Sequence, residues 1–193
     1  MQPVILAPEE IARLLHGIKN PTHQAMVALA YGAGLKIKEI VALKIENIDF
    51  QEQLIRLDER NTLLPHKLKI ALWRRALNRP PDDQVFINRR QRPFSEKNVQ
   101  RIFRRALRQT GLAKTIRFQV LRHSFAAHLA ENGIDLKVIQ NLMGHKSPRT
   151  TQIYALIYPP RPQKIQSPLE RVGFIIASPE NTSNKRWVEC QRY

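Results

Sequence analysis

The sequence predicts a mainly α-helical (α+β) domain that carries a small antiparallel β-sheet or hairpin. Apolar residues recur at helical spacing over much of the chain, most clearly in 97–109, where Val99, Phe103 and Leu107 share one face. Two short apolar runs, 54–57 and 62–64, have the length of strands and are separated by a turn-like stretch. The 193 residues are 42% hydrophobic, which suits one packed domain with a single core.

In the first half of the chain, proline and glycine mark the ends of the predicted elements. Pro8 and the acids after it suit a first helical turn, and Asn20-Pro21 ends that helix. The next helix is rich in alanine and methionine, which predicts that it is buried, and two glycines follow it. Pro65 ends the hairpin. The elements predicted in this half are helices near 8–18, 22–32, 36–43 and 66–79, with strands at 54–57 and 62–64.

The second half begins with a Pro- and Asp-rich loop at 80–83 and ends in a polar stretch. Ser95 is the expected N-cap of the helix 97–109, and Gly111 is its expected stop. The other predicted elements are a strand at 85–87 and helices at 119–132, 136–143 and 147–155. We therefore expect one domain over 1–173 and a weakly structured C-terminal tail over 174–193.

The charge balance favours a polyanion as the partner. Lys and Arg total 32 against 16 acids, so the net charge is +16. The alternatives are a basic surface kept for solubility, or a tail that binds anionic membrane. No apolar run approaches the roughly 20 residues of a membrane span, and the single cysteine, Cys190, fits a reducing compartment. We expect a cytoplasmic, nucleoid-associated protein that does not bind membranes.

The stretch 118–154 brings three reactive side chains into one short region. The Arg122 guanidinium can hold phosphate oxygens in a planar fork, and the His145 imidazole can donate a hydrogen bond or shuttle a proton. The Tyr154 phenol can attack phosphorus. Together they suit cleavage of a phosphodiester through a covalent phosphotyrosine, without a metal or another cofactor.

These residues lie in motifs that resemble the tyrosine recombinase (phage integrase) signature. LRHSFA carries Arg122, LMGH carries His145 and TTQIY carries Tyr154. PEEIARLL, YGAGLKIKEIVALKIENIDF and the hairpin precede them in the family's order, so the likeness spans about 7–172. The resemblance implies the family's catalytic domain without its helical N-terminal DNA-binding domain. QSPLERV at 166–172 is similar to the end of integron-type integrases, whose insertion before LRH is absent, so the subgroup stays open.

The resemblance assigns roles to these side chains, each weighed against a plainer interpretation. It makes Tyr154 the nucleophile, with Arg122 and His145 stabilising the charged phosphorane. Without that context, Arg122 is a helix-surface residue, His145 a helix cap and Tyr154 a core aromatic. Tyr158 is a competing phenol that lacks the TTxI context. His123 and His128 are expected to be structural.

Three family positions carry different residues, which predicts impaired chemistry. Lys36 stands where the family has its first arginine, and it keeps the charge but loses the two-pronged grip on phosphate. Gln119 stands where the family has a histidine, and it cannot move a proton. Counting back from the end of the hairpin places Leu57 where the family has a lysine that protonates the leaving 5′-oxygen. Losing a general acid costs roughly 10²–10⁴ in rate.

Arginines outside the motifs are the expected DNA contacts. They comprise Arg101, Arg104, Arg105 and Arg108 on the polar face of the helix 97–109, with Arg56 and Arg60 in the hairpin. The expected partner is duplex DNA, and self-association on DNA is left open. The acids form no constellation with ligand spacing, so no metal site is expected. The apolar residues Leu169, Val172 and Phe174 are expected to form an exposed docking element.

Two functions follow from these features. The first is a tyrosine recombinase that exchanges DNA strands through a 3′-phosphotyrosine intermediate, with impaired cleavage. Its catalytic set is Tyr154, Arg122, His145, Lys36 and Gln119. The alternative is a catalytically inactive DNA-binding relic or regulator that uses the same basic surface.

Overall fold

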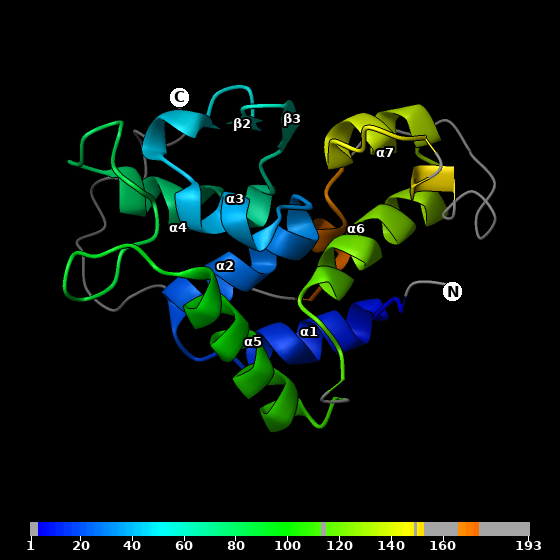
Figure 1. Ribbon diagram of the computed structural model, residues 1–193, viewed down its shortest axis with the longest axis horizontal. Coiled ribbons are helices and arrows are strands. Elements are labelled where there is room, and N and C mark those ends of the chain that lie inside the picture. The colour runs from blue at the N-terminus through cyan, green and yellow to red at the C-terminus, as the bar shows by residue number, and fades with distance from the viewer. Residues whose placement is uncertain (1–3, 113–114, 149, 153–165, 174–193) are drawn as a thin grey trace.

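Helices packed around one central helix make up most of the protein, as the computed structural model shows (Figure 1). It describes residues 4–112, 115–148, 150–152 and 166–173. In chain order the elements are α1 (Pro8–His16), α2 (Pro21–Gly32), α3 (Ile37–Ala42), the 3₁₀ turn η1 (Ile45–Asn47), β1 (Ile48–Asp49), β2 (Leu54–Leu57), β3 (Arg60–Leu63), α4 (His66–Ala76), α5 (Glu96–Thr110), α6 (Gln119–Glu131), α7 (Leu136–Met143) and the 3₁₀ turn η2 (Pro168–Arg171). The predicted mainly helical fold with a small antiparallel sheet is confirmed.

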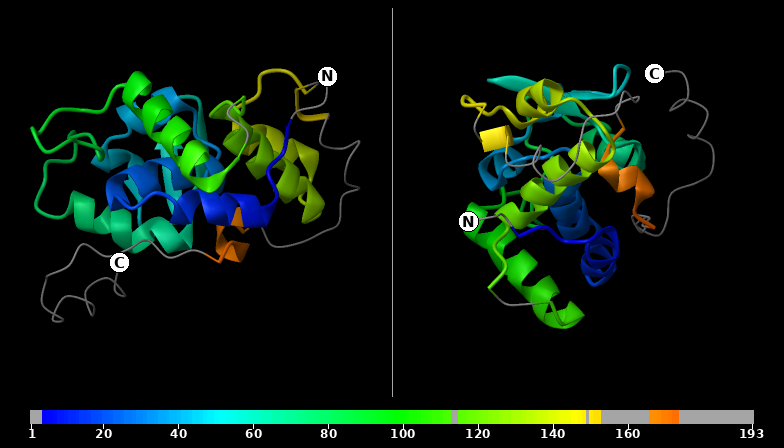
Figure 2. Two further views of the ribbon diagram at one scale, coloured as in Figure 1. Left: turned by 90° about the horizontal axis from the view of Figure 1, so that it is seen from below. Right: turned by 90° about the vertical axis from the view of Figure 1, so that its right-hand side faces the viewer.

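The central helix is α2, and it is buried on every side. Every residue from Gln24 to Gly32 is buried, as the Ala-rich sequence predicts. Its N-terminus is capped by Asn20, whose side-chain oxygen accepts from the N–H groups of Thr22 and His23 at 2.9 and 3.1 Å. The helices α4, α5 and α6 and the turn η2 all contact α2. Figure 2 shows α5 on one side of it, with α4 and η2 on the other.

The sheet has three antiparallel strands in the order β1-β2-β3. Leu57 pairs with Arg60 at the end of the β2–β3 ladder, so Asp58 and Glu59 form the turn. The strand predicted at 85–87 was wrong, because residues 84 and 87 make only isolated bridges and β1 supplies the third strand. Val85 and Phe86 are instead buried in the core. Their apolar character therefore reflects a loop packed inward rather than a strand.

The helices α6 and α7 form a second, smaller core. Its buried residues include Phe125, Leu129 and Met143. The loop between α2 and α3 runs tightly against α6 at Gly34, where φ is +63°. A Cβ at Gly34 would lie 2.7 Å from Cδ1 of Phe125, so only glycine fits this position. This close approach brings the start of α3 beside α6.

The segment 166–173 packs on the domain's own core. Leu169 is fully buried and Val172 is 2% exposed. The Ser167 hydroxyl donates to the Gly32 carbonyl at 2.5 Å, and the Lys67 ammonium donates to the Val172 carbonyl at 2.5 Å. The expectation that Leu169 and Val172 form an exposed docking element was therefore wrong, because α2 and α4 already cover them. Phe174 lies outside the described residues.

Candidate active site

Three of the predicted catalytic residues come from different elements and lie near one another. Lys36 is the N-cap of α3, Arg122 lies one turn into α6, and His145 follows the glycine that ends α7. Arg122 donates to the carbonyls of Gly34 and Met143, which lie two residues before Lys36 and two residues before His145. Gln119 is exposed at the start of α6. Tyr154 lies outside the described residues.

Arg122 is held in place by backbone carbonyls. The residue is only 6% exposed. Its Nη1 donates to the Gly34 carbonyl and its Nη2 donates to the Met143 carbonyl. One acceptor belongs to the loop before α3 and the other to the last turn of α7. The guanidinium is thereby oriented by two segments that lie far from it in sequence.

His145 is fixed through both its backbone and its ring. Its backbone N–H donates to the Gln140 backbone carbonyl, and its backbone carbonyl accepts from the Gln140 side-chain amide, both at 3.1 Å. Its Nδ1 lies 2.9 Å from the hydroxyl of Thr151, which is buried. Burial lowers the pKa of His145 to about 4, and the nearby cations Arg122, Lys36 and Arg60 add to this effect. At neutral pH the imidazole is therefore neutral and offers one N–H.

Lys36 faces a shallow groove between α3 and the hairpin. Its backbone N–H donates to Glu39 Oε2 at 2.7 Å, and its ammonium lies 3.8 Å from Glu39 Oε1. The side chain is 37% exposed, so solvent or a ligand can reach it. The groove has a volume of about 380 Å³, and Leu57 and Arg60 line it from the hairpin side. Leu57 therefore lies across the groove from Lys36.

The two hairpin arginines differ in their surroundings. Arg56 is 54% exposed, and its guanidinium bonds Asp49 at 2.6 Å. Arg60 is different, because its side chain is only 5% exposed and its donors are directed to protein acceptors. The expectation that Arg60 contacts DNA needs correction, since its guanidinium is turned into the protein toward α3 and α7.

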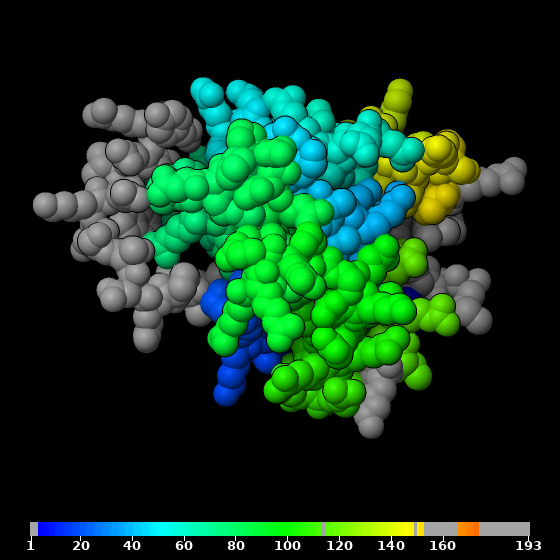
Figure 3. Space-filling view, turned by 60° about the vertical axis from the view of Figure 1, so that its left-hand side comes forward, coloured from blue at the N-terminus to red at the C-terminus, as the bar shows by residue number. Residues whose placement is uncertain are grey.

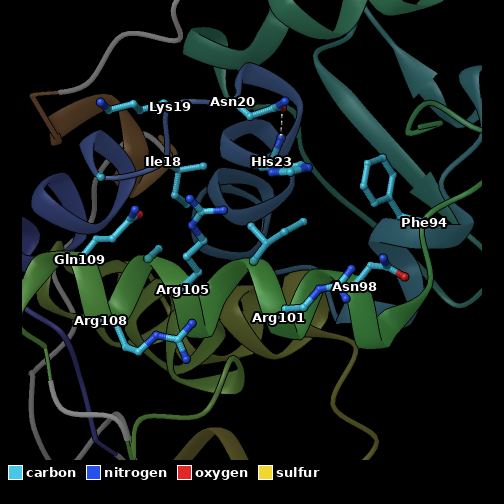
Figure 4. Close-up of a pocket in the computed structure, with 13 residues that line it drawn as sticks. Ile18, Lys19, Asn20, His23, Phe94, Asn98, Arg101, Arg105, Arg108 and Gln109 are labelled. Atoms are coloured by element: carbon cyan, nitrogen blue, oxygen red, sulfur yellow. Dashed lines mark hydrogen bonds between the residues drawn. The ribbon is translucent and has the colours of Figure 1, made fainter. Parts of the chain in front are cut away.

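The arginines of α5 lie on two sides of the helix. All four are exposed. Arg101, Arg105 and Arg108 line a surface hollow of about 760 Å³, together with Lys19 and His23 (Figure 4). Arg104 does not line it. We call this hollow the basic groove. None of the described residues that line it is acidic.

The basic groove runs between α5 and the loop that joins α1 to α2. Figure 3 shows this side of the molecule, with α5 in green and the blue α1–α2 region beside it. Its apolar floor includes Ile18 and Ile102. Burial and the charge of Arg105 lower the pKa of His23, so that imidazole does not add a positive charge at neutral pH. The positive charge of the groove comes from the arginines and Lys19.

Several groups that organise the site were not predicted from the sequence. Glu39 and Thr151 lie inside the quoted motifs, and the three-residue spacing of Lys36 and Glu39 is the available signal for the first of them. The carbonyls of Gly34 and Met143 carry no side-chain signal at all. Among the described residues, no group of His, Cys, Asp and Glu could hold a metal ion. No described helix is long and apolar enough to cross a membrane.

Comparisons with known proteins show which proteins the chain is similar to. The sequence pattern of the Phage integrase family matches residues 5–159. Tyrosine recombinase XerC of Chlamydia caviae is 37% identical over 142 residues, which cover 68% of this chain and 46% of that protein. Tyrosine recombinase XerA of Pyrococcus furiosus is 34% identical over 168 residues, covering 80% of this chain and 58% of that protein. The chain therefore spans about half the length of these relatives.

A solved structure shares the fold. The crystal structure of XerA recombinase superposes with a TM-score of 0.71 at 30% sequence identity. The match covers 80% of this chain and 60% of that chain. The helical arrangement around α2 is thus one that a solved recombinase also adopts.

Proposed function

Because the chain belongs to the phage integrase family, we propose that it is a tyrosine recombinase domain that cleaves and rejoins DNA through a 3′-phosphotyrosine. The observation that carries this proposal is that Arg122 bonds the backbone two residues before Lys36 and two residues before His145. Two cations and a neutral N–H donor suit the charge that develops on a phosphorane. The relatives are named tyrosine recombinases, which supports the same conclusion.

The reaction follows from these groups. The Tyr154 oxygen attacks phosphorus, the bond from phosphorus to the 5′-oxygen breaks, and a 3′-phosphotyrosine and a 5′-hydroxyl result. Arg122 and Lys36 offset the negative charge of the non-bridging oxygens, and the Gln119 amide donates a hydrogen bond to the same phosphate. The neutral His145 donates one hydrogen bond. Attack by the 5′-hydroxyl of another strand reverses the step and joins that strand without any external energy source.

The cleavage step is impaired because its leaving-group acid is missing. Leu57 lines the groove opposite Lys36, at the position where the family carries a lysine. A leucine cannot protonate the leaving 5′-oxygen, and Arg60 is turned into the protein. Losing a general acid costs roughly 10²–10⁴ in rate. Replacing an arginine by Lys36 removes bidentate contact and adds to this loss.

Duplex DNA is the substrate that the charges of the domain fit. The net charge is +16, and the basic groove places three arginines and a lysine along one side of α5. Such a surface binds phosphates with little regard to sequence. We include self-association on DNA in this proposal, because strand exchange needs two cleaved duplexes.

The alternative function is DNA binding without cleavage. It is favoured by Leu57, which lines the groove where the family carries a lysine and cannot donate a proton to the leaving 5′-oxygen. The two functions make different predictions for a covalent complex, since only a recombinase forms a bond from Tyr154 to DNA.

The test is covalent trapping on nicked DNA. The substrate is a pool of duplexes with randomised sequence, each with one nick. When the protein cleaves near the nick, the short fragment with the 5′-hydroxyl diffuses away, so rejoining stops and the covalent complex accumulates. Protein that migrates with DNA on a denaturing gel supports the recombinase. Tyr154→Phe should abolish the band, whereas the matched control Tyr158→Phe should retain it. Binding without a band from the unchanged chain would favour the alternative.

A further inference from the structure

Arg60 lies at the start of β3 and makes an unusual number of contacts for a hairpin residue. Its Nε donates to the Leu142 carbonyl at 2.8 Å. Its Nη1 and Nη2 donate to the two carboxylate oxygens of Glu39 at 3.2 and 2.9 Å. Its Nη2 also lies 3.2 Å from the Gly34 carbonyl. The planar fork therefore joins the hairpin to the α2–α3 loop, to α3 and to the end of α7.

Each acceptor of Arg60 either bonds a proposed catalytic residue or lies close to one in sequence. The Gly34 carbonyl also accepts from Arg122. The Glu39 carboxylate also accepts the backbone N–H of Lys36. Leu142 immediately precedes Met143, whose carbonyl accepts from Arg122, and His145 follows two residues later. One buried guanidinium thus contacts hydrogen-bond partners of Arg122 and Lys36, and a backbone carbonyl three residues before His145.

The end of α7 is shaped to admit Arg60. Gly144 has a φ of +59°, and a Cβ there would lie 2.6 Å from Cδ of Arg60. The glycine therefore serves the end of the helix and also leaves room for the arginine stem.

We propose that Arg60 is a positioning residue for strand cleavage, which holds the α2–α3 loop, α3 and the end of α7 in the arrangement that aligns Lys36, Arg122 and His145. This inference rests on the proposed function. This role of the hairpin differs from the one that the family resemblance implies, which is to supply a proton donor. Lysine cannot replace the arginine here, because one ammonium cannot reach a carboxylate and two carbonyls in a fixed plane.

The rival explanation is that Arg60 stabilises the fold and does nothing more. Substitution would then lower the thermal midpoint without changing the site. Arg79 offers a matched control, because it also joins a carboxylate and backbone carbonyls. It bonds Asp83 at 3.3 Å and the carbonyls of Arg75 and Gln84 at 3.1 and 2.7 Å. Its partners all lie in α4 or in the loop that follows α4, which are not the segments that Arg60 joins.

The experiment compares Arg60→Lys, Arg60→Met, Arg79→Lys and Arg79→Met in the full chain. The first readout is the pKa of His145, which is measured by NMR of its imidazole during a pH titration. The second is the rate of covalent complex formation on the nicked duplex pool. All measurements are made below the thermal midpoint of each variant. Arg60→Lys is the decisive variant because it keeps the positive charge and loses only the fork.

We expect Arg60→Lys to raise the His145 pKa at least halfway from about 4 toward its ordinary value of 6.5, because a loosened α7 end exposes the ring to water. The rate of complex formation should fall on the order of 10²-fold, as for other small misplacements. Arg60→Met should show both effects more strongly, since it also removes a charge. The Arg79 variants should match the unchanged chain in both readouts.

The outcomes separate the two proposals. An Arg60→Lys chain that keeps the His145 pKa and the cleavage rate, while losing stability like the Arg79 variants, would overturn the positioning role. If the unchanged chain still forms the covalent complex, the proposed function holds even though the positioning role fails. If no complex forms even from the unchanged chain, the proposed function fails. The pKa comparison then still decides what Arg60 does.

Discussion

At the scale of single residues, His145 shows how burial selects a chemical role. Its ordinary pKa would leave it partly charged near neutral pH, but burial and the charges of Arg122, His123, Lys36 and Arg60 lower that pKa to about 4. The imidazole is therefore neutral near pH 7, which fits the proposed role of a hydrogen-bond donor rather than that of a cation. The Thr151 hydroxyl is hydrogen-bonded to Nδ1 at 2.9 Å, and the tautomer of the ring decides which of the two groups donates.

The depressed pKa of His145 predicts a pH dependence of stability. Below pH 6.5 the unfolded chain takes up a proton that the folded chain refuses until about pH 4, so stability falls as the pH drops through this window. His23, His123 and His128 also have lowered pKa values and contribute in the same direction. Thermal midpoints measured from pH 7 to pH 4 should therefore fall less for His145→Asn than for the unchanged chain. Equal slopes for the two proteins would count against the low pKa.

Gly34 is a second residue whose surroundings predict a measurable effect. Gly34→Ala combines a positive φ with a Cβ 2.7 Å from Phe125, so we expect a loss of about 2–4 kcal/mol in the free energy of unfolding. Gly111→Ala is the matched control, because φ there is +71° but nothing lies within 4 Å of the added carbon. It should cost about 1–2 kcal/mol. Denaturant unfolding measures both, and equal losses would show that the contact with Phe125 does not matter.

At the scale of elements, η2 closes the core where the sequence indicates little regular structure. Leu169→Ala should reduce the free energy of unfolding by about 2–5 kcal/mol, because the side chain is fully buried against α2. Ile70→Ala on α4 removes the same kind of side chain from a site that is 36% exposed, and it should change stability by only about 0.5 kcal/mol. Chemical denaturation of both variants tests this difference. A Leu169 variant as stable as the Ile70 variant would restore the idea of an exposed docking element.

The elements that could be predicted are those whose ends carry local signals. Ser95 and Gly111 bracket α5 within a residue of its observed bounds, and α7 was predicted over its observed length. Local patterns failed where tertiary contacts decide. The run at 85–87 is apolar because it packs into the core, and η2 is ordered by contacts with residues more than 100 positions away.

The same distinction holds for the site. Lys36, Arg122 and His145 were identified because each lies in a motif of its own. The orientation of Arg60 could not be identified in this way, because the Leu142 carbonyl that its Nε reaches is 82 positions along the chain. Exposed and buried arginines look alike in sequence, and only the packed hairpin separates Arg56 from Arg60.

At the scale of the whole molecule, charge predicts how the domain meets DNA. Affinity for duplex DNA should fall steeply with salt, with a slope near −0.9 for each phosphate neutralised. Arg105→Gln should reduce that slope by about 1 if the basic groove holds a phosphate. Fluorescence anisotropy across a salt series measures it. A slope that changes for Arg104→Gln but not for Arg105→Gln would place the DNA on the other side of α5.

The central claim is that the site is assembled but lacks two groups, an arginine at Lys36 and a proton donor at Leu57. The most direct test is the rate of covalent complex formation on the nicked duplex pool by the double variant Lys36→Arg, Leu57→Lys. We predict a rate at least about 10²-fold above that of the unchanged chain, with little gain from either single change. Adding Tyr154→Phe should abolish the product. An unchanged chain that already reacts as fast as the double variant, or a product that survives Tyr154→Phe, would contradict the claim.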